Sequence, residues 1–309
     1  MPVNPPPAPT LSGDLLTIHR LLQSPAQIQR RLRTIQDMRF IADQVLTQRY
    51  RSAGGAVLYE VSEPIFNTRP IEAVSPGSEY PKDVTAEGAA ALAAVSKWGQ
   101  ATRLTDERIK RNARPGNELD RVLRKVVNTV IKHIDTITMS AVASAVTATQ
   151  AAGDDWVAST ATILRDIELA VADIEDLQMG YRPDTIVMSN TKYAYLASDE
   201  KIANLRQRET RDNPVYGGEV EVIGGLVVVK APLSVLPSDD VWILDSMQLG
   251  GMADEAEVDP GYTVAEMAVQ VQSERLARQD GWEVWGRRIT VPVIQEPAAG
   301  IKITGTNPA

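Results

Sequence analysis

Residues 117–148 form an amphipathic repeat that is typical of one long helix. Apolar residues recur every three or four positions on one face, while charged and polar residues occupy the other. The apolar face consists of Leu119, Val122, Leu123, Val126, Val130, Ile134, Ile137 and Ala141. At 1.5 Å per residue, a helix of this length spans about 45 Å. One long helix is therefore predicted to dominate the fold.

The segment from Val57 to Gln100 has the pattern of two strands without a core of its own. Apolar residues alternate with other residues at its start, and an extended pattern resumes over 95–100. Between these ends, prolines interrupt a stretch that contains few large apolar residues. We therefore predict a long two-stranded excursion that packs against something else, such as another subunit.

The second half of the chain has the alternation of strands and helices that is typical of an α/β layer. Short apolar runs that predict strands lie at 185–188, 220–223, 226–229 and 241–244. Ser189 or Asn190 can cap the helix that follows the first run, and Gly224-Gly225 predicts a hairpin between the second and third. Near the C-terminus, 267–272 and 282–294 predict a pair of long strands.

The sequence contains no convincing set of catalytic or cofactor-binding residues. It has no cysteine, and its two histidines, His19 and His133, have no metal ligands at nearby spacings. The glycine-rich phosphate motifs and the G-x-S-x-G and H-E-x-x-H motifs are absent. Apolar residues make up 43% and charged residues 23% of the chain, which is ordinary globular usage. We therefore expect a structural building block without a cofactor, a metal or an enzymatic activity.

The chain is also expected to be made in a cytoplasm. No apolar run is long enough to span a membrane. The proline-rich start lacks the basic and apolar regions of a secretory signal. No membrane partner is therefore expected.

Charge is unevenly distributed along the chain, whose net charge is −8. Residues 1–51 contain seven arginines and three acidic residues. This is typical either of a solvated helix face or of a basic arm that meets a polyanion or an acidic neighbour. Residues 239–259 contain seven acidic residues and no lysine or arginine. A divalent metal site is one interpretation of this cluster, and a solvated acidic loop is the favoured one.

Four segments together carry a resemblance to a known family. Residues 76–81 form a turn bounded by prolines, and 97–107 form an extended stretch that leads toward the long helix. Residues 183–196 combine a strand with a capped helix, and 224–245 contain further strands. In this order and spacing, over about residues 40–296, the chain resembles the major capsid proteins of tailed bacteriophages, which have the Hong Kong 97-type (HK97-like) fold.

The resemblance implies an α+β fold in which the long helix is the family's spine helix. The expected parts are an N-terminal arm (1–50), an extended loop or E-loop (51–103), a peripheral domain with the spine helix (104–150 and 262–297), an α/β axial domain (151–261) and a C-terminal tail (298–309). The axial domain would point toward the symmetry axes of the assembly.

The resemblance also implies a function. The chain would be a major capsid protein that self-assembles as hexamers and pentamers into the icosahedral shell around the double-stranded DNA of a tailed phage. The other expected partners are a separate scaffolding protein, a portal, a cement or decoration protein, and packaged DNA met by non-specific proximity. The protein would be found in the virion capsid and would assemble in the cytoplasm of the host bacterium.

Three groups of residues are predicted to serve assembly. Contacts between subunits are expected at the E-loop residues Tyr59, Pro76, Gly77, Tyr80, Lys82 and Trp98. The arm is expected to face the interior of the shell through Arg30, Arg31 and Arg33. An acidic loop of the axial domain, containing Asp254, Glu255, Glu257 and Asp259, is expected near a local symmetry axis.

Two other functions fit parts of the pattern. Encapsulin nanocompartments share the HK97-like fold and package enzymes, but their usual N-terminal helix differs from the proline-rich start here. A soluble α/β enzyme or binding protein would need a pocket with convergent polar groups, and it would form only small oligomers in solution.

Overall fold

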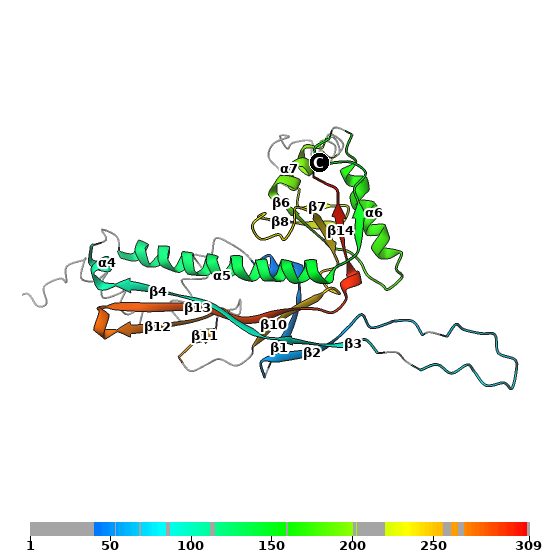
Figure 1. The fold of residues 1–309 in the computed structure, drawn as a ribbon, viewed down its shortest axis with the longest axis horizontal. Helices are drawn as coiled ribbons and strands as arrows, with labels where there is room; N and C mark the ends of the chain where they lie inside the picture. Colours follow the sequence, from blue (N-terminus) through cyan, green and yellow to red (C-terminus); the bar gives the residue numbers. More distant parts are fainter. Residues whose placement is uncertain are drawn as a thin grey trace, which may run out of the picture.

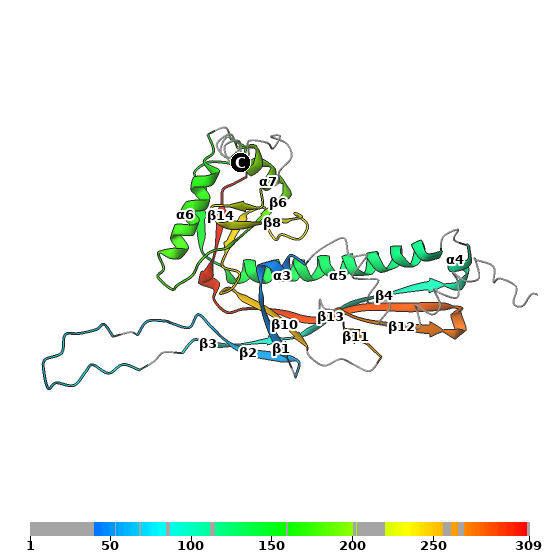
Figure 2. The same ribbon diagram turned by 180° about the vertical axis from the view of Figure 1, so that it is seen from behind.

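The computed structural model describes residues 40–52, 54–67, 69–84, 87–111, 115–158, 160–199, 202, 220–255, 261–264 and 269–307. Two β-sheet modules, a long helix and a narrow hairpin make up this part of the chain (Figure 1). The hairpin extends beyond both modules, so the molecule is elongated (Figure 2). The buried apolar side chains of both modules form one continuous cluster.

The first sheet is built around a single long strand. Its strands are β1 (Gln48–Ser52), β4 (Ser96–Thr105), β10 (Gly250–Glu255), β11 (Thr263–Val264), β12 (Gln270–Leu276) and β13 (Gly281–Ile294). β13 pairs antiparallel with β12, β4 and β10, and β1 pairs in parallel with β10. β12 and β13 confirm the predicted pair of C-terminal strands.

The predicted long helix is confirmed as α5 (Pro115–Ala145), which lies along β4 and β13 (Figure 1). Its apolar face packs onto the sheet through buried residues such as Val122, Val126 and Val130. A Cβ atom added at Gly286 of β13 would lie 3.0 Å from Val126 Cγ1, so a glycine permits this close approach. The short helix α4 (Asp106–Arg111) joins β4 to α5. Among the described helices, none is both long and apolar enough to cross a membrane.

The second sheet confirms the predicted α/β layer. In spatial order its strands are β5 (Thr149–Ala151), β14 (Gly300–Thr304), β9 (Val241–Leu244), β6 (Thr185–Ser189), β8 (Leu226–Ala231) and β7 (Val222–Ile223). The predicted strands at β6 and β9 are completely buried, and β7 and β8 form the predicted hairpin. α6 (Ile163–Glu175) packs on β5, β14 and β9, and α7 (Asn190–Ser198) packs on β6 and β8. Ser189 caps α7, because its hydroxyl accepts a hydrogen bond from the Lys192 backbone N–H at 3.2 Å.

The expectation of a C-terminal tail at 298–309 is wrong, because these residues include a strand inside the second sheet. β14 lies between β5 and β9, with Ile301 and Ile303 buried. Beyond it, the backbone carbonyl of Thr306 accepts a hydrogen bond from the buried amine of Lys192. Two buried isoleucines separated by a polar residue are too short a pattern to indicate a strand on their own.

The N-terminal arm cannot extend to residue 50, because the chain enters the core at Phe40. In the short helix α3 (Ala42–Val45), Ala42 and Val45 are buried, as are the residues on either side of the helix. The Asp135 carboxylate on α5 accepts a hydrogen bond from the Ala42 backbone N–H at 2.9 Å. The predicted arm therefore shortens to residues that precede the described part of the chain.

We expect the buried Asp135 carboxyl group to make the stability of the folded chain depend on pH. Burial raises its pKa to about 6, although the backbone hydrogen bonds of Ala42 and Ile41 lower it. In the unfolded chain the pKa of an aspartate is about 3.9. The folded state therefore binds more protons than the unfolded state between about pH 4 and pH 6. The stability that this group contributes is complete below about pH 4 and is lost as the pH rises through 6.

We expect Asp135→Asn, which keeps an oxygen for the Ala42 N–H, to remove this dependence. The variant should be more stable than the unchanged protein by about 2–3 kcal/mol at pH 7.5 and equally stable near pH 4, since one pKa unit is worth about 1.4 kcal/mol. Denaturant unfolding of the unassembled chains at both pH values measures the difference. A difference that does not change with pH would contradict the prediction.

Candidate assembly interface

The hairpin formed by β2 (Ala56–Val61), β3 (Ala89–Ala94) and the chain between them is separate from both sheet modules. β2 and β3 pair antiparallel and form a two-stranded sheet. At its base, the backbone N–H of Ser62 donates to the carbonyl of Gln295 at 2.9 Å. The chain between the two strands continues outward, away from both modules (Figures 1 and 2). The predicted two-stranded excursion is therefore confirmed.

The hairpin carries large apolar side chains that are exposed. They are Leu58, Ile65, Phe66, Ile71, Tyr80, Val84 and Leu92. Ile71 is completely exposed, and Leu58 lies opposite Leu92 across the two strands. A group of exposed apolar residues on one narrow projection is typical of a surface that is covered by a partner.

The tip of the hairpin contains the turn that the sequence predicted at Pro76-Gly77. The backbone N–H of Ser78 donates to the carbonyl of Ser75 at 3.0 Å, which closes the turn. Gly77 has a φ angle of +87°, a conformation that glycine adopts without strain. Nearby, Tyr80 and Lys82 are exposed, and the Lys82 amine lies 3.4 Å from the Glu79 carboxylate. Their contact with another subunit stays a prediction.

Two other predicted contact residues lie against their own chain. Tyr59 is half-buried and lines a cavity of about 370 Å³ at the base of the hairpin. Trp98 lies on β4, not in the hairpin, and its ring meets the ring of His133 on α5 edge-on at 4.7 Å. Trp98 therefore helps to attach α5 to the first sheet.

The prediction that Asp254 and Glu255 belong to an acidic loop of the axial domain is wrong. Both lie on β10, which pairs with β13 in the first sheet and not with the second module. Glu257 and Asp259 lie outside the described residues, as do Arg30, Arg31 and Arg33 of the predicted arm. Within the described part of the chain, no cluster of three or more acidic or histidine residues could hold a metal ion.

Asp254 belongs to a buried ion cluster that the sequence analysis missed. The Arg288 side chain is only 1% exposed, and its Nε donates to Asp254 Oδ1 at 2.9 Å. The same guanidinium donates to Asp43 Oδ1 at 3.2 Å, and it lies 4.8 Å from the centre of the Phe40 ring. Arg49 reaches Asp43 from the solvent side at 2.9 Å.

The charge of Arg288 is stabilised inside the protein. Burial alone would lower its pKa, but the hydrogen bonds and negative charges of Asp254 and Asp43 outweigh burial and raise it. Two adjacent arginines in the apolar pattern of 282–294 were a signal for such a cluster, since buried arginines need acidic partners. The cluster joins α3, β10 and β13.

Comparison with solved structures shows which class of protein has this fold. A capsid structure of the cyanophage P-SCSP1u is similar with a TM-score of 0.60 and 13% identity, over 84% of this chain and 86% of that chain. A phage-related protein from Bordetella bronchiseptica RB50 has a TM-score of 0.57 and 14% identity, over 91% of this chain and 97% of that chain. A virus-like particle from Pyrococcus furiosus has a TM-score of 0.56 and 11% identity, over 90% of this chain and 98% of that chain. The fold is the HK97-like capsid fold, as predicted.

The sequence itself gives the family. Residues 88–303 match the family model described as phage capsid protein. The match covers most of the chain, which therefore belongs to the phage capsid protein family. Comparison with curated proteins gives no significant match. The chain is accordingly a structural protein of a capsid shell.

Proposed function

We propose that this protein self-assembles as hexamers and pentamers into an icosahedral shell that encloses the double-stranded DNA of a tailed phage. The observation that carries the proposal is the hairpin, which exposes apolar side chains on a projection too narrow to bury them. If another subunit covers these side chains, the contact gains about 25 cal/mol for every Å² of apolar surface removed from water. A neighbouring copy provides such a cover at every position of a closed shell.

The proposal also assigns each part of the fold to a region of the capsid subunit. The first sheet with α5 would be the peripheral domain, and the second sheet, including β14, would be the axial domain that faces the symmetry axes. The segment from β2 to β3 would be the E-loop, with Pro76, Gly77, Tyr80 and Lys82 at its tip. A scaffolding protein, a portal and a cement protein would complete the particle, which would assemble in the host cytoplasm and carry out no catalysis.

Analytical ultracentrifugation of the purified protein tests this function. Shell assembly predicts capsomers of five and six chains together with much larger closed particles. A single species of one to four chains at all concentrations would contradict it and would favour a soluble enzyme or binding protein. The contents of the particles then separate a phage capsid, which contains DNA, from an encapsulin, which contains a cargo protein.

A further inference from the structure

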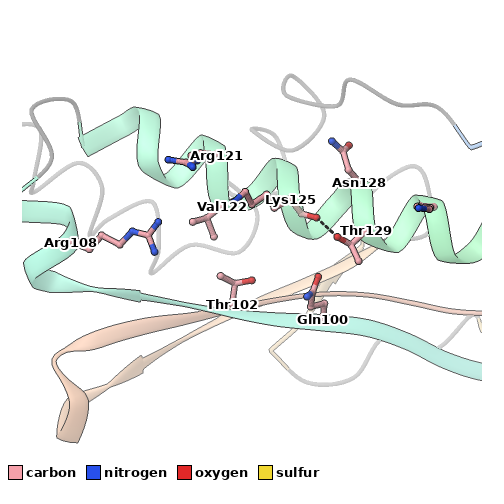
Figure 3. Close-up of a pocket in the computed structure, with 9 residues that line it drawn as sticks. Gln100, Thr102, Arg108, Arg121, Val122, Lys125, Asn128 and Thr129 are labelled. Carbon is pink, nitrogen blue, oxygen red and sulfur yellow. Dashed lines mark hydrogen bonds between the residues drawn. The ribbon is translucent and has the colours of Figure 1, made fainter.

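A groove with basic side chains lies between α5 and β4 (Figure 3). Its volume is about 590 Å³. It is lined by Gln100, Thr102, Arg108, Arg121, Val122, Lys125, Asn128, Thr129 and Lys132. Among these residues four are positively charged and none is negatively charged. The groove is therefore suited to an occupant with several negative charges.

The cations of α5 form a row along the groove. Arg121 and Lys125 are one helical turn apart, and Lys132 follows two turns later, so the row extends over about 16 Å of helix. All three side chains are exposed. Gln100 and Thr102 point toward the helix from β4 and add neutral hydrogen-bonding groups to the opposite wall (Figure 3).

We propose that this groove binds the phosphate backbone of the packaged nucleic acid. This inference rests on the proposed function, because only a shell around nucleic acid brings a polyanion against every copy of the groove. A DNA duplex has one negative charge per 1.7 Å of axis, or about ten charges along the length of this row. Arginine, lysine, threonine, asparagine and glutamine side chains are the groups that usually contact phosphates. The face that α5 covers would then line the interior of the shell.

The acidic hairpin of a second copy is the other candidate occupant, and the structure favours it less. Residues 56–94 contain six acidic and two basic residues. Arg69 pairs with Glu72 at 3.3 Å, and Lys82 pairs with Glu79 at 3.4 Å. Asp83 accepts the backbone N–H of Arg69 at 2.8 Å. Half of the acidic side chains of the hairpin thus have partners within the hairpin itself.

The lining also indicates which part of the nucleic acid is bound. No aromatic side chain lines the groove, although stacking on aromatic rings is the usual way to hold unpaired bases. Trp98, two residues before Gln100 on β4, is packed against His133. Binding should therefore depend on phosphates and salt and not on base sequence.

Fluorescence anisotropy with a labelled mixed-sequence DNA duplex of about 30 base pairs tests the inference on unassembled protein. The test variant is Lys125→Gln/Lys132→Gln. The control is Lys82→Gln/Lys97→Gln, which removes the same number of positive charges outside the groove. Lys82 lies near the hairpin tip. Lys97 lies on the face of β4 opposite the groove, because the side chains of a strand alternate between its two faces. Each lost phosphate contact lowers the slope of log K against log salt by about 0.9. We expect the test variant to lose about 2 from this slope and to bind at least about tenfold more weakly, with the control unchanged.

Equal losses in both variants, or no loss in the test variant, would overturn the inference. If the test variant binds DNA normally but no longer assembles, the occupant is the acidic hairpin of a neighbour. Assembly is therefore followed in parallel by sedimentation. Shells formed by the test variant, together with weak DNA binding, support the inference. A failure of the unchanged protein to form shells would count against the proposed function and not against binding in the groove.

Discussion

Arg288→Met is expected to lower the free energy of unfolding by about 3–5 kcal/mol. The substitution removes the buried cation that Asp43 and Asp254 share and leaves them only the half-exposed Arg49. Breaking a buried ion pair from one side has a cost of this size. Methionine keeps the apolar stem against Phe40, so lost packing contributes little. Denaturant unfolding of the unassembled protein measures the change.

The surface pair of Arg275 and Asp106 provides a matched control. Arg275 also donates to both oxygens of one carboxylate, at 2.6 and 2.7 Å, and also lies near an aromatic ring, that of Trp282 at 5.6 Å. Its side chain is 37% exposed, so Arg275→Met should cost less than about 1 kcal/mol. Adding Asp43→Asn and Asp254→Asn to Arg288→Met should recover part of the loss. Equal losses for the two arginines would show that the buried cluster has no special role.

The second large effect is expected on assembly. Phe66→Ser, Ile71→Ser and Val84→Ser in one chain should remove about 4 kcal/mol of apolar burial per subunit contact, since a buried apolar side chain contributes about 1.5 kcal/mol or more. This corresponds to roughly a thousandfold weaker association. Shells should disappear at concentrations where the unchanged protein assembles, which light scattering measures directly.

The same triple variant should leave the fold of the unassembled chain intact, because these three side chains are exposed within it. Its midpoint of thermal unfolding should stay close to that of the unchanged protein. Asn67→Ala, Ser75→Ala and Ser78→Ala, at other exposed positions of the hairpin, provide the control and should assemble normally. Normal assembly of the serine variant would show that the apolar residues of the hairpin are not the contact.

Elements that depend on local periodicity could be predicted from the sequence. Each of these patterns lies within one continuous stretch of the chain. Examples are the repeat of α5, the apolar runs of β6 and β9 and the cap at Ser189. The lack of a core between Val57 and Gln100 could be predicted for the same reason, because it is a property of that segment alone.

Elements that depend on distant partners could not be predicted in this way. Asp43 and Arg288 are 245 positions apart in the chain, and neither residue has a local pattern that identifies the other. β14 is held between strands that begin at residues 149 and 241. The acidic segment 239–259 passes from β9 in the second sheet to β10 in the first. For the candidate interface, the sequence indicated the segment, but the exposure of residues such as Phe66 and Ile71 became evident only in the folded chain.

Electron cryomicroscopy of the purified, assembled protein tests the shell function most directly. The expected result is a closed icosahedral shell in which residues 62–88 of every copy lie on a neighbouring copy. Phe66, Ile71 and Val84 should then be buried between subunits. Small oligomers, or shells in which the hairpin folds back on its own chain and these side chains remain exposed, would contradict it.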